Sequence, residues 1–113
     1  MHQFDLNNKT AVIAGGAQGF GFDIAKRFLN SGAKVIIWDI DENELIKASK
    51  KLNNPNLSYN VLDVSNFKIV KKTVDEIVKS SNIDILINNA GITGSTSSLW
   101  DYDVDEWNKI VQI

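Results

Sequence analysis

Short, uninterrupted apolar runs alternate along this chain with segments of helical periodicity, and this alternation restricts the fold more than any other feature. A run such as Thr10–Ala14 is apolar at nearly every position, as expected of a strand that is buried on both faces. After each run, apolar side chains recur three or four residues apart, which predicts helices with one buried face. We therefore expect strands at residues 10–14, 33–39, 57–62 and 84–88, with helices between them.

The predicted helices have recognisable ends. The first begins near Gly19, and Gly32 is placed to end it. The acidic pair at residues 41–42 opens the second, and Ser65 can cap the third. After the fourth strand, residues 91–98 have loop composition, and residues 103–106 form a capping box that predicts one more helix.

This order predicts an α/β fold, a doubly wound parallel sheet of Rossmann-like type that stops after the fourth strand and its following helix. Continuous apolar strands separated by amphipathic helices specify a parallel sheet that is covered on both faces. In such a sheet the ligand crevice lies beyond the carboxyl ends of the strands, where the strand order reverses. Residues 1–113 show no internal linker or repeat, so we expect a single domain.

Composition excludes several classes of function. The 113 residues carry a net charge of −2, which gives no electrostatic footprint for nucleic acid or an anionic membrane. Cysteine is absent, which excludes disulfides and thiolate metal sites, and no other metal site is predicted. The polar first nine residues do not resemble a signal peptide, and the apolar runs are too short to span a bilayer. We expect a soluble, cytoplasmic protein.

The loop after the first strand is the strongest candidate for a binding site. Gly15, Gly19 and Gly21 stand where a strand turns into a helix, with Gln18 and Phe20 between them. Small residues at this place let the backbone approach a diphosphate, and the free N–H groups of the helix attract it. The alternative is a glycine-rich turn that serves only close packing of strand and helix. The strand before the loop and the helix after it favour phosphate binding.

An acidic residue ends the second predicted strand. Asp39 stands 18 residues beyond Gly21, where a carboxylate accepts hydrogen bonds from the adenosine ribose of NAD. The next residue is Ile40 rather than a basic one, and the glycine loop holds no Lys or Arg. A 2′-phosphate would meet this carboxylate, so NAD is favoured over NADP. The alternative is that Asp39 only caps the next helix, a role that Asp41 can fill instead.

The third and fourth strands also end in polar loops. Asp63 and Val64 follow the third strand, and the carboxylate there is suited to the adenine amino group; it would otherwise be a solvated turn residue. The fourth strand runs into Asn88-Asn89-Ala90-Gly91. Asparagine side chains can bond backbone groups of neighbouring strand ends, while the two small residues leave space for a flat cofactor. By spacing alone this stretch would also suit an ordinary turn.

Together the four loops resemble the short-chain dehydrogenases/reductases, from about Leu6 to the end of the chain. The glycine loop is similar to the family's T-G-x-x-x-G-x-G motif, residues 63–64 to its adenine-contacting pair, and residues 88–91 to its N-N-A-G motif. Residues 105–113 resemble the helix that follows that motif. Ala14 departs from the usual threonine, which removes a loop hydrogen bond worth about 1 kcal/mol. This resemblance implies NAD as cofactor and Gly15, Gln18, Gly19, Phe20, Gly21, Asp39, Ile40, Asp63, Val64, Asn89, Ala90 and Gly91 as the residues that bind it.

The resemblance also implies hydride transfer between NAD(H) and an alcohol or carbonyl substrate, 3-oxoacyl or sugar-derived, in a homo-oligomer. The family's catalytic Tyr-x-x-x-Lys has no match here: four residues after Tyr59 and Tyr102 stand Asp63 and Glu106. A phenol needs a neighbouring lysine to act near neutral pH. We assign no catalytic residue and expect the chain to be the inactive N-terminal part of such an enzyme. The alternative is a nucleotide-binding or interaction module without catalysis.

Overall fold

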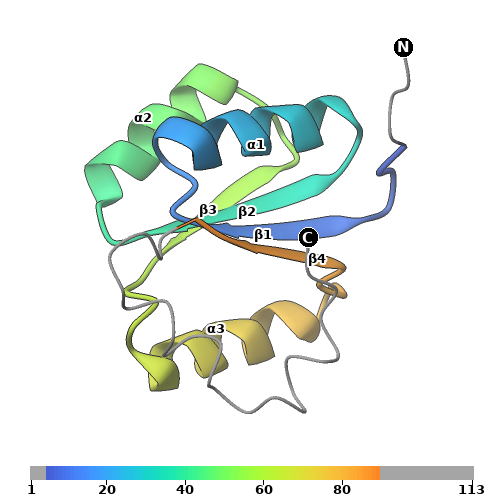
Figure 1. Cartoon of the computed structure of the whole chain (residues 1–113). Coiled ribbons are helices and arrows are strands. Elements are labelled where there is room, and N and C mark those ends of the chain that lie inside the picture. Colours follow the sequence, from blue (N-terminus) through green and yellow to red (C-terminus); the bar gives the residue numbers. More distant parts are fainter. Residues whose placement is uncertain (1–4, 90–113) are drawn as a thin grey trace.

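The computed structural model describes residues 5–89, which form a four-stranded parallel sheet with helices on both faces (Figure 1). The spatial order of the strands is β3-β2-β1-β4, so the first strand in the sequence lies inside the sheet. Strand pairing is parallel throughout. The elements are β1 (Thr10–Ala14), α1 (Gly19–Asn30), β2 (Lys34–Asp39), α2 (Glu42–Leu52), β3 (Leu57–Val61), α3 (Phe67–Val78) and β4 (Ile85–Asn88).

The strand order reverses beside β1. The connections through α1 and α2 carry the chain outward from β1 to β2 and β3, and the connection through α3 returns it past β1 to β4. Helices α1 and α2 consequently cover one face of the sheet and α3 covers the other (Figure 1). The doubly wound, Rossmann-like arrangement predicted from the sequence is confirmed. In sheets of this kind the ligand crevice is expected where the order reverses, at the carboxyl ends of β1 and β4.

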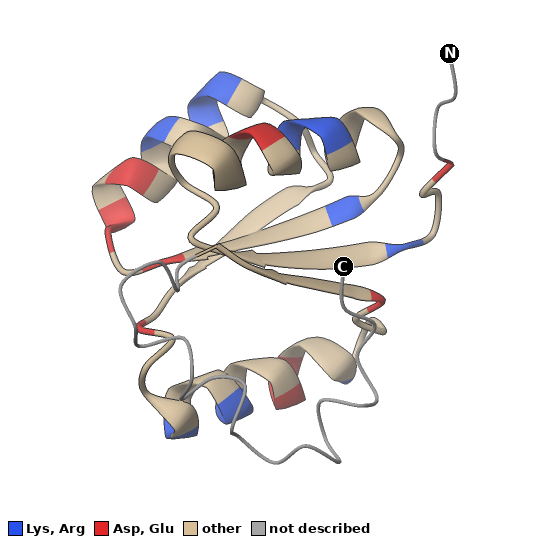
Figure 2. Cartoon of the chain, in the orientation of Figure 1, with Lys and Arg blue, Asp and Glu red and all other residues tan. Residues whose placement is uncertain are grey.

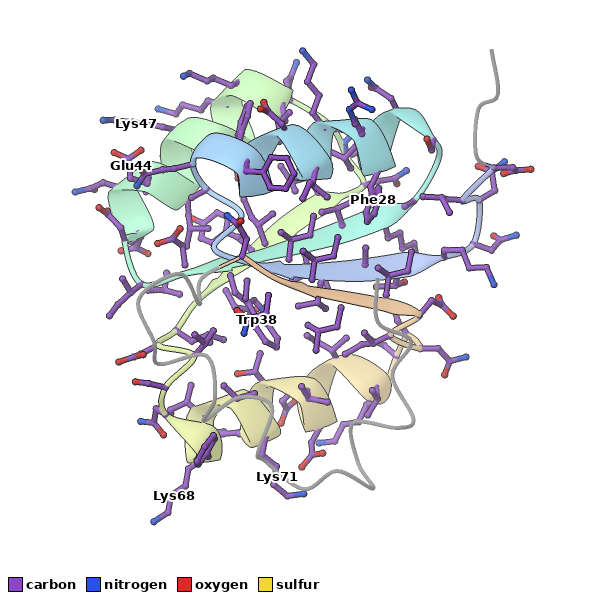
Figure 3. All side chains as sticks on the ribbon, viewed as in Figure 1. Phe28, Trp38, Glu44, Lys47, Lys68 and Lys71 are labelled. Atoms are coloured by element: carbon purple, nitrogen blue, oxygen red, sulfur yellow. The ribbon has the colours of Figure 1, made fainter. Side chains whose placement is uncertain are left out.

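Two apolar layers hold the sheet between its helices. One layer packs α1 and α2 against the sheet, with Ile13, Ala25 and Leu45 among its fully buried residues and Phe28 at its margin. The other layer packs α3 against the opposite face and is dominated by the indole of Trp38 (Figure 3). Val12 and Ala14 of β1 belong to the α3 layer and Ile13 to the other, and all five residues of β1 are buried. Burial on both faces explains the uninterrupted apolar run.

Most predicted element ends agree with the structure, and one cap does not. Gly32 follows the end of α1 with φ +95°, a conformation that favours glycine. Asp41 is the N-cap of α2, where its Oδ1 accepts the Glu44 N–H at 3.2 Å. The predicted capping role of Ser65 is wrong. Asn66 caps α3 instead, its Oδ1 accepting the Ile69 N–H at 3.2 Å.

Some predictions concern residues outside the described range. Ala90, Gly91, the loop at residues 91–98 and the helix at residues 103–113 all lie beyond residue 89. Within residues 5–89, no helix has both the length and the apolar character needed to cross a membrane.

Candidate functional site

The glycine loop is fastened to the end of β2 by its backbone. The N–H groups of Gly15 and Gly16 both donate to the carbonyl oxygen of Trp38, at 2.7 and 3.3 Å. Gly15 has φ +76° and Gly19 has φ +56°, left-handed conformations that other L-residues adopt only with strain. These bonds and angles turn the chain sharply out of β1 and bring the start of α1 above the carboxyl end of the sheet.

Two glycines permit this close approach because a side chain would not fit. A Cβ atom on Gly21 would run into the carbonyl oxygen of Gly15 and lie 2.9 Å from Nδ2 of Asn89. A Cβ atom on Gly16 would lie 2.6 Å from Cγ2 of Ile37. The importance of Gly16 was not identified from the sequence. The constraint comes from the side chain of Ile37, so no local pattern in the sequence signals it.

The N-terminus of α1 differs from those of the other helices. Its N-cap residue, Gln18, makes no side-chain hydrogen bond to the helix, and its first turn, unlike that of α2, contains no acidic residue. The first N–H groups of a helix have no partner within the helix, and they carry the positive end of its dipole. At α1 they are left without a side-chain acceptor from Gln18, whereas α2 and α3 begin with a capping Asp or Asn. This helix end is therefore suited to an anion.

A cleft of about 280 Å³ lies beside the glycine loop, at the carboxyl ends of β2 and β3. The Leu62 N–H donates to the carbonyl oxygen of Asp39 at 3.0 Å, which extends the pairing of β2 and β3 past the last strand residues. This bond brings the loops after the two strands to a common edge. The cleft is lined by Gly15, Trp38, Asp39, Ile40, Leu62, Asp63 and Val64.

Both carboxylates of the cleft are held by nearby groups. Asp39 Oδ1 accepts the Asp41 N–H at 3.1 Å, while the capping of α2 belongs to Asp41 itself. Asp63 Oδ1 accepts two hydrogen bonds from Ser65, from its Oγ at 2.7 Å and from its N–H at 2.9 Å. The hydroxyl bond, and then the backbone bond, hold the pKa of the Asp63 carboxyl below its ordinary value. Asp63 is thus ionised at neutral pH and acts only as an acceptor.

The end of β4 closes the site on its other side. The Asn89 N–H donates to the Ala14 carbonyl oxygen at 2.9 Å, and its Nδ2 donates to the Gly15 carbonyl oxygen at 3.3 Å. The expected bond from an asparagine side chain across neighbouring strand ends is therefore present. The side-chain N and O of Asn88 are buried and have no hydrogen-bond partner within residues 5–89.

Five described residues of the predicted set do not line the cleft: Gln18, Gly19, Phe20, Gly21 and Asn89. Gln18 and Gly19 line a second groove of about 220 Å³ between the start of α1 and α2. Lys47 and Glu44 of α2 also line this groove, and Lys47 Nζ lies 3.5 Å from Glu44 Oε1 (Figure 3). Phe20 is 71% exposed and lines neither space. The site thus has two parts: a cleft with acidic walls, and the glycine loop with the first turn of α1.

Acidic rather than basic residues lie at the carboxyl edge of the sheet. Acidic residues gather where β2 and β3 end and α2 begins, whereas the basic residues of α1 and α2 lie farther along these helices (Figure 2). No Lys or Arg occurs at residues 10–25, 35–46 or 52–67, which include all the loops at this edge except the one after β4. These segments therefore offer backbone N–H groups but no basic side chain to an anionic ligand, whereas Lys47 and Lys51 of α2 line the groove beside Gln18 and Gly19.

A family model described as short chain dehydrogenase matches residues 9–113. The chain belongs to the short chain dehydrogenase family. The match includes the glycine loop, the acidic ends of β2 and β3, and the asparagines after β4, so the family resemblance seen in the sequence is confirmed. The two parts of the site are formed by these same segments.

Known members support the assignment to this family of oxidoreductases. An uncharacterised oxidoreductase of Bacillus subtilis is 39% identical over 112 residues, 96% of this chain and 41% of the relative. A 3-oxoacyl-(acyl-carrier-protein) reductase of Chlamydia muridarum is 36% identical over 110 residues, 94% of this chain and 44% of the relative. The crystal structure of a Brucella melitensis 3-ketoacyl-(acyl-carrier-protein) reductase complexed with NADH matches with a TM-score of 0.65 and 33% identity, over 72% of this chain and 33% of that one. This short chain dehydrogenase therefore spans less than half the length of these relatives.

Proposed function

We propose that this chain is the NAD-binding part of a short chain dehydrogenase that transfers hydride between NAD(H) and an alcohol or carbonyl substrate. The observation that carries the proposal is the placement of an uncapped helix start directly beside a cleft with two carboxylates. An anion-binding helix end and acceptors for hydroxyl and amino groups are the two features that an adenine dinucleotide needs from a protein.

The residues of the site fit such a cofactor. Nothing lies within 4 Å of a Cβ position at Gly19, which leaves the start of α1 open to a diphosphate that the N–H groups at residues 19–21 would bind. Asp39 would accept hydrogen bonds from the adenosine ribose. The cleft between Ile40 and Val64 would take the adenine, with Asp63 as the acceptor for its amino group.

The charges at this edge favour NAD over NADP. A 2′-phosphate on the ribose would lie beside the Asp39 carboxylate, and none of the segments at residues 10–25, 35–46 and 52–67 supplies a basic side chain to offset the repulsion. The Brucella reductase is complexed with NADH, which supports the same choice. Bound NAD(H) would supply the hydride chemistry, and the residues described here would hold it at the switch point beside β1 and β4.

Substrate class follows from the relatives rather than from these residues. The chlamydial and Brucella proteins are both named for reduction of 3-oxoacyl groups on acyl-carrier protein, so such a thioester is the first substrate to test, ahead of sugar-derived carbonyls. We further propose a cytoplasmic homo-oligomer. A panel of 3-oxoacyl thioesters and sugar-derived ketones, with oxidation of NADH followed at its absorbance band, distinguishes the two classes in the enzyme.

Calorimetric titration tests the cofactor assignment directly. The chain should bind NAD⁺ more tightly than NADP⁺, by about tenfold for an added phosphate beside the Asp39 carboxylate. Asp39→Ala should weaken NAD⁺ binding and reduce the difference between the two cofactors. Glu42→Gln removes an exposed acid of the same edge that does not line the cleft, and it should change neither affinity. Tighter binding of NADP⁺ by the unmodified chain would contradict the assignment of Asp39.

A further inference from the structure

Ser65 makes two hydrogen bonds that helix capping does not explain. Both its Oγ and its N–H donate to the same oxygen, Oδ1 of Asp63, at 2.7 and 2.9 Å. Its side chain is not needed at the start of α3, because Asn66 performs the capping there. The Ser65 hydroxyl therefore serves the carboxylate of Asp63 rather than the helix.

The backbone around this carboxylate is fixed as well. The Leu62 N–H bonds to the Asp39 carbonyl oxygen at 3.0 Å, and the Leu62 side chain is buried. On the other side, the Asn66 N–H bonds to the carbonyl oxygen of Asp63 at 3.0 Å. Asp63 is thus held between the end of β3 and the start of α3, and only its side-chain torsions remain to be set.

The two bonds from Ser65 determine those torsions. Asp63 is exposed, and an exposed carboxylate rotates freely unless neighbouring groups restrain it. Two donors on Oδ1 fix the carboxylate plane, and a charge-assisted hydrogen bond of 2.7 Å is a strong one. Within residues 5–89, every hydrogen bond to this carboxylate goes to Oδ1, so Oδ2 keeps its acceptor capacity for a ligand.

We propose that Ser65 is a positioning residue, which aims Asp63 Oδ2 into the cleft so that the site selects a 6-aminopurine over a 6-oxopurine dinucleotide. This role depends on the proposed function. An acceptor fixed in place gains a hydrogen bond from an exocyclic amino group, and it meets only the lone pairs of an oxo group. Val64 and Ile40 line the same cleft and contribute apolar contact, which does not distinguish the two bases.

The test compares the affinities of NAD⁺ and of its hypoxanthine analogue, in which an oxygen replaces the adenine amino group. The unmodified chain should favour NAD⁺ by about tenfold, the effect of one hydrogen bond to a charged group. Ser65→Ala should weaken NAD⁺ binding by about three- to tenfold and leave the affinity for the analogue unchanged. Ser65→Thr keeps the hydroxyl and should restore the preference.

Asn66→Ala is the matched control, because it removes the cap of α3 and leaves the Asp63–Ser65 bonds in place. It should lower the melting temperature without changing the ratio of the two affinities. If Ser65→Ala weakens both dinucleotides equally, or leaves the ratio unaltered, the positioning role is wrong while NAD⁺ binding stands. If the unmodified chain binds neither dinucleotide, the proposed function fails and this role fails with it.

Discussion

Helices α1 and α2 both begin at the carboxyl edge of the sheet, yet they begin in opposite ways. Asp41 caps α2, and Glu42 and Glu44 in its first turn complement the helix dipole. α1 has no side-chain cap and no acid in its first turn, and Gly19 and Gly21 occupy two of its first three positions. The first arrangement favours the stability of the helix, and the second leaves its N-terminus open to an external anion.

The two helix starts differ in their contribution to the free energy of unfolding. A capping side chain contributes about 1 kcal/mol, and each glycine in a helix is about 1 kcal/mol less favourable than alanine. The φ of +56° at Gly19 is not helical, so the propensity cost applies to Gly21 alone, and α1 starts roughly 2 kcal/mol less stable than an equivalent helix with a start like that of α2. Packing offsets this deficit, because Ala25 and Leu29 are buried against the sheet. A helix start of low local stability with free backbone N–H groups is what the proposed diphosphate site requires.

Gly21→Ala should have the largest effect, because it breaks the contact on which the open helix start depends. The new Cβ would collide with the Gly15 carbonyl oxygen, and the strain of such overpacking is about 1–3 kcal/mol, more than the gain in helix propensity. NAD⁺ affinity should fall about a hundredfold as the loop moves away from β4. Calorimetry and urea denaturation measure the two losses.

Gly19→Ala provides the comparison within the same helix start. No atom lies within 4 Å of a Cβ at this position, so only its φ of +56° opposes the substitution. The expected loss of stability is about 1 kcal/mol, the cost of a left-handed conformation for alanine. Equal losses for the two variants would show that the close approach of residue 21 to Gly15 costs no more than the left-handed strain at residue 19.

Gln18→Asp should give α1 the kind of start that α2 has. The introduced carboxylate can accept an N–H of the first turn, which should raise the free energy of unfolding by about 1 kcal/mol. It would also occupy the proposed place of the diphosphate with a negative charge, so NAD⁺ affinity should fall about tenfold. The variant must therefore show opposite changes in stability and in binding. A gain in both would mean that the diphosphate does not bind at this helix end.

Asp41→Ala should give α2 a start without a side-chain cap, like that of α1. It removes the hydrogen bond to the Glu44 N–H and should lower the free energy of unfolding by about 1 kcal/mol. The backbone N–H that donates to Asp39 remains, so NAD⁺ affinity should stay within about twofold. Urea denaturation with a parallel titration distinguishes this outcome from a general loosening of the edge, in which both quantities would fall.

The sequence predicted correctly those segments whose residue pattern fits a single structure. The run at Thr10–Ala14 could only be a strand buried on two faces, and its predicted bounds agree with β1. Asp39 at the end of β2 and Asp63 after β3 were expected at one edge, because parallel strands end together, and they line one cleft. Topology brings such residues together whatever the details of their side chains.

The sequence was less informative where two neighbours could perform the same task. Ser65 and Asn66 are both good capping residues, and only the backbone turn at Asp63 decides that Asn66 caps α3. The need for glycine at residue 16 depends on the side chain of Ile37, 21 positions later, so no local pattern could reveal it. Long-range packing and the choice between adjacent donors require coordinates.

The smallest predicted effect comes from removing the bond of the Ser65 hydroxyl to Asp63. It is measured as a change in how the free energy of unfolding depends on pH. The Ser65 bonds lower the pKa of Asp63 in the folded chain below its ordinary value of 3.8. Their electrostatic contribution to stability is therefore present in full above pH 3.8 and is lost as the pH falls through the lowered pKa. Ser65→Ala should destabilise the chain slightly at pH 6, and the difference from the unmodified chain should shrink as the pH falls below 3.8.

Ser80→Ala is the control, because it removes a hydroxyl that donates to the Ile77 carbonyl rather than to a carboxylate, so its effect should not vary with pH. Urea denaturation at several pH values between about 6 and 3 measures both variants, and a Ser65→Ala difference that stays constant over this range would show that the hydroxyl does not stabilise the ionised carboxylate.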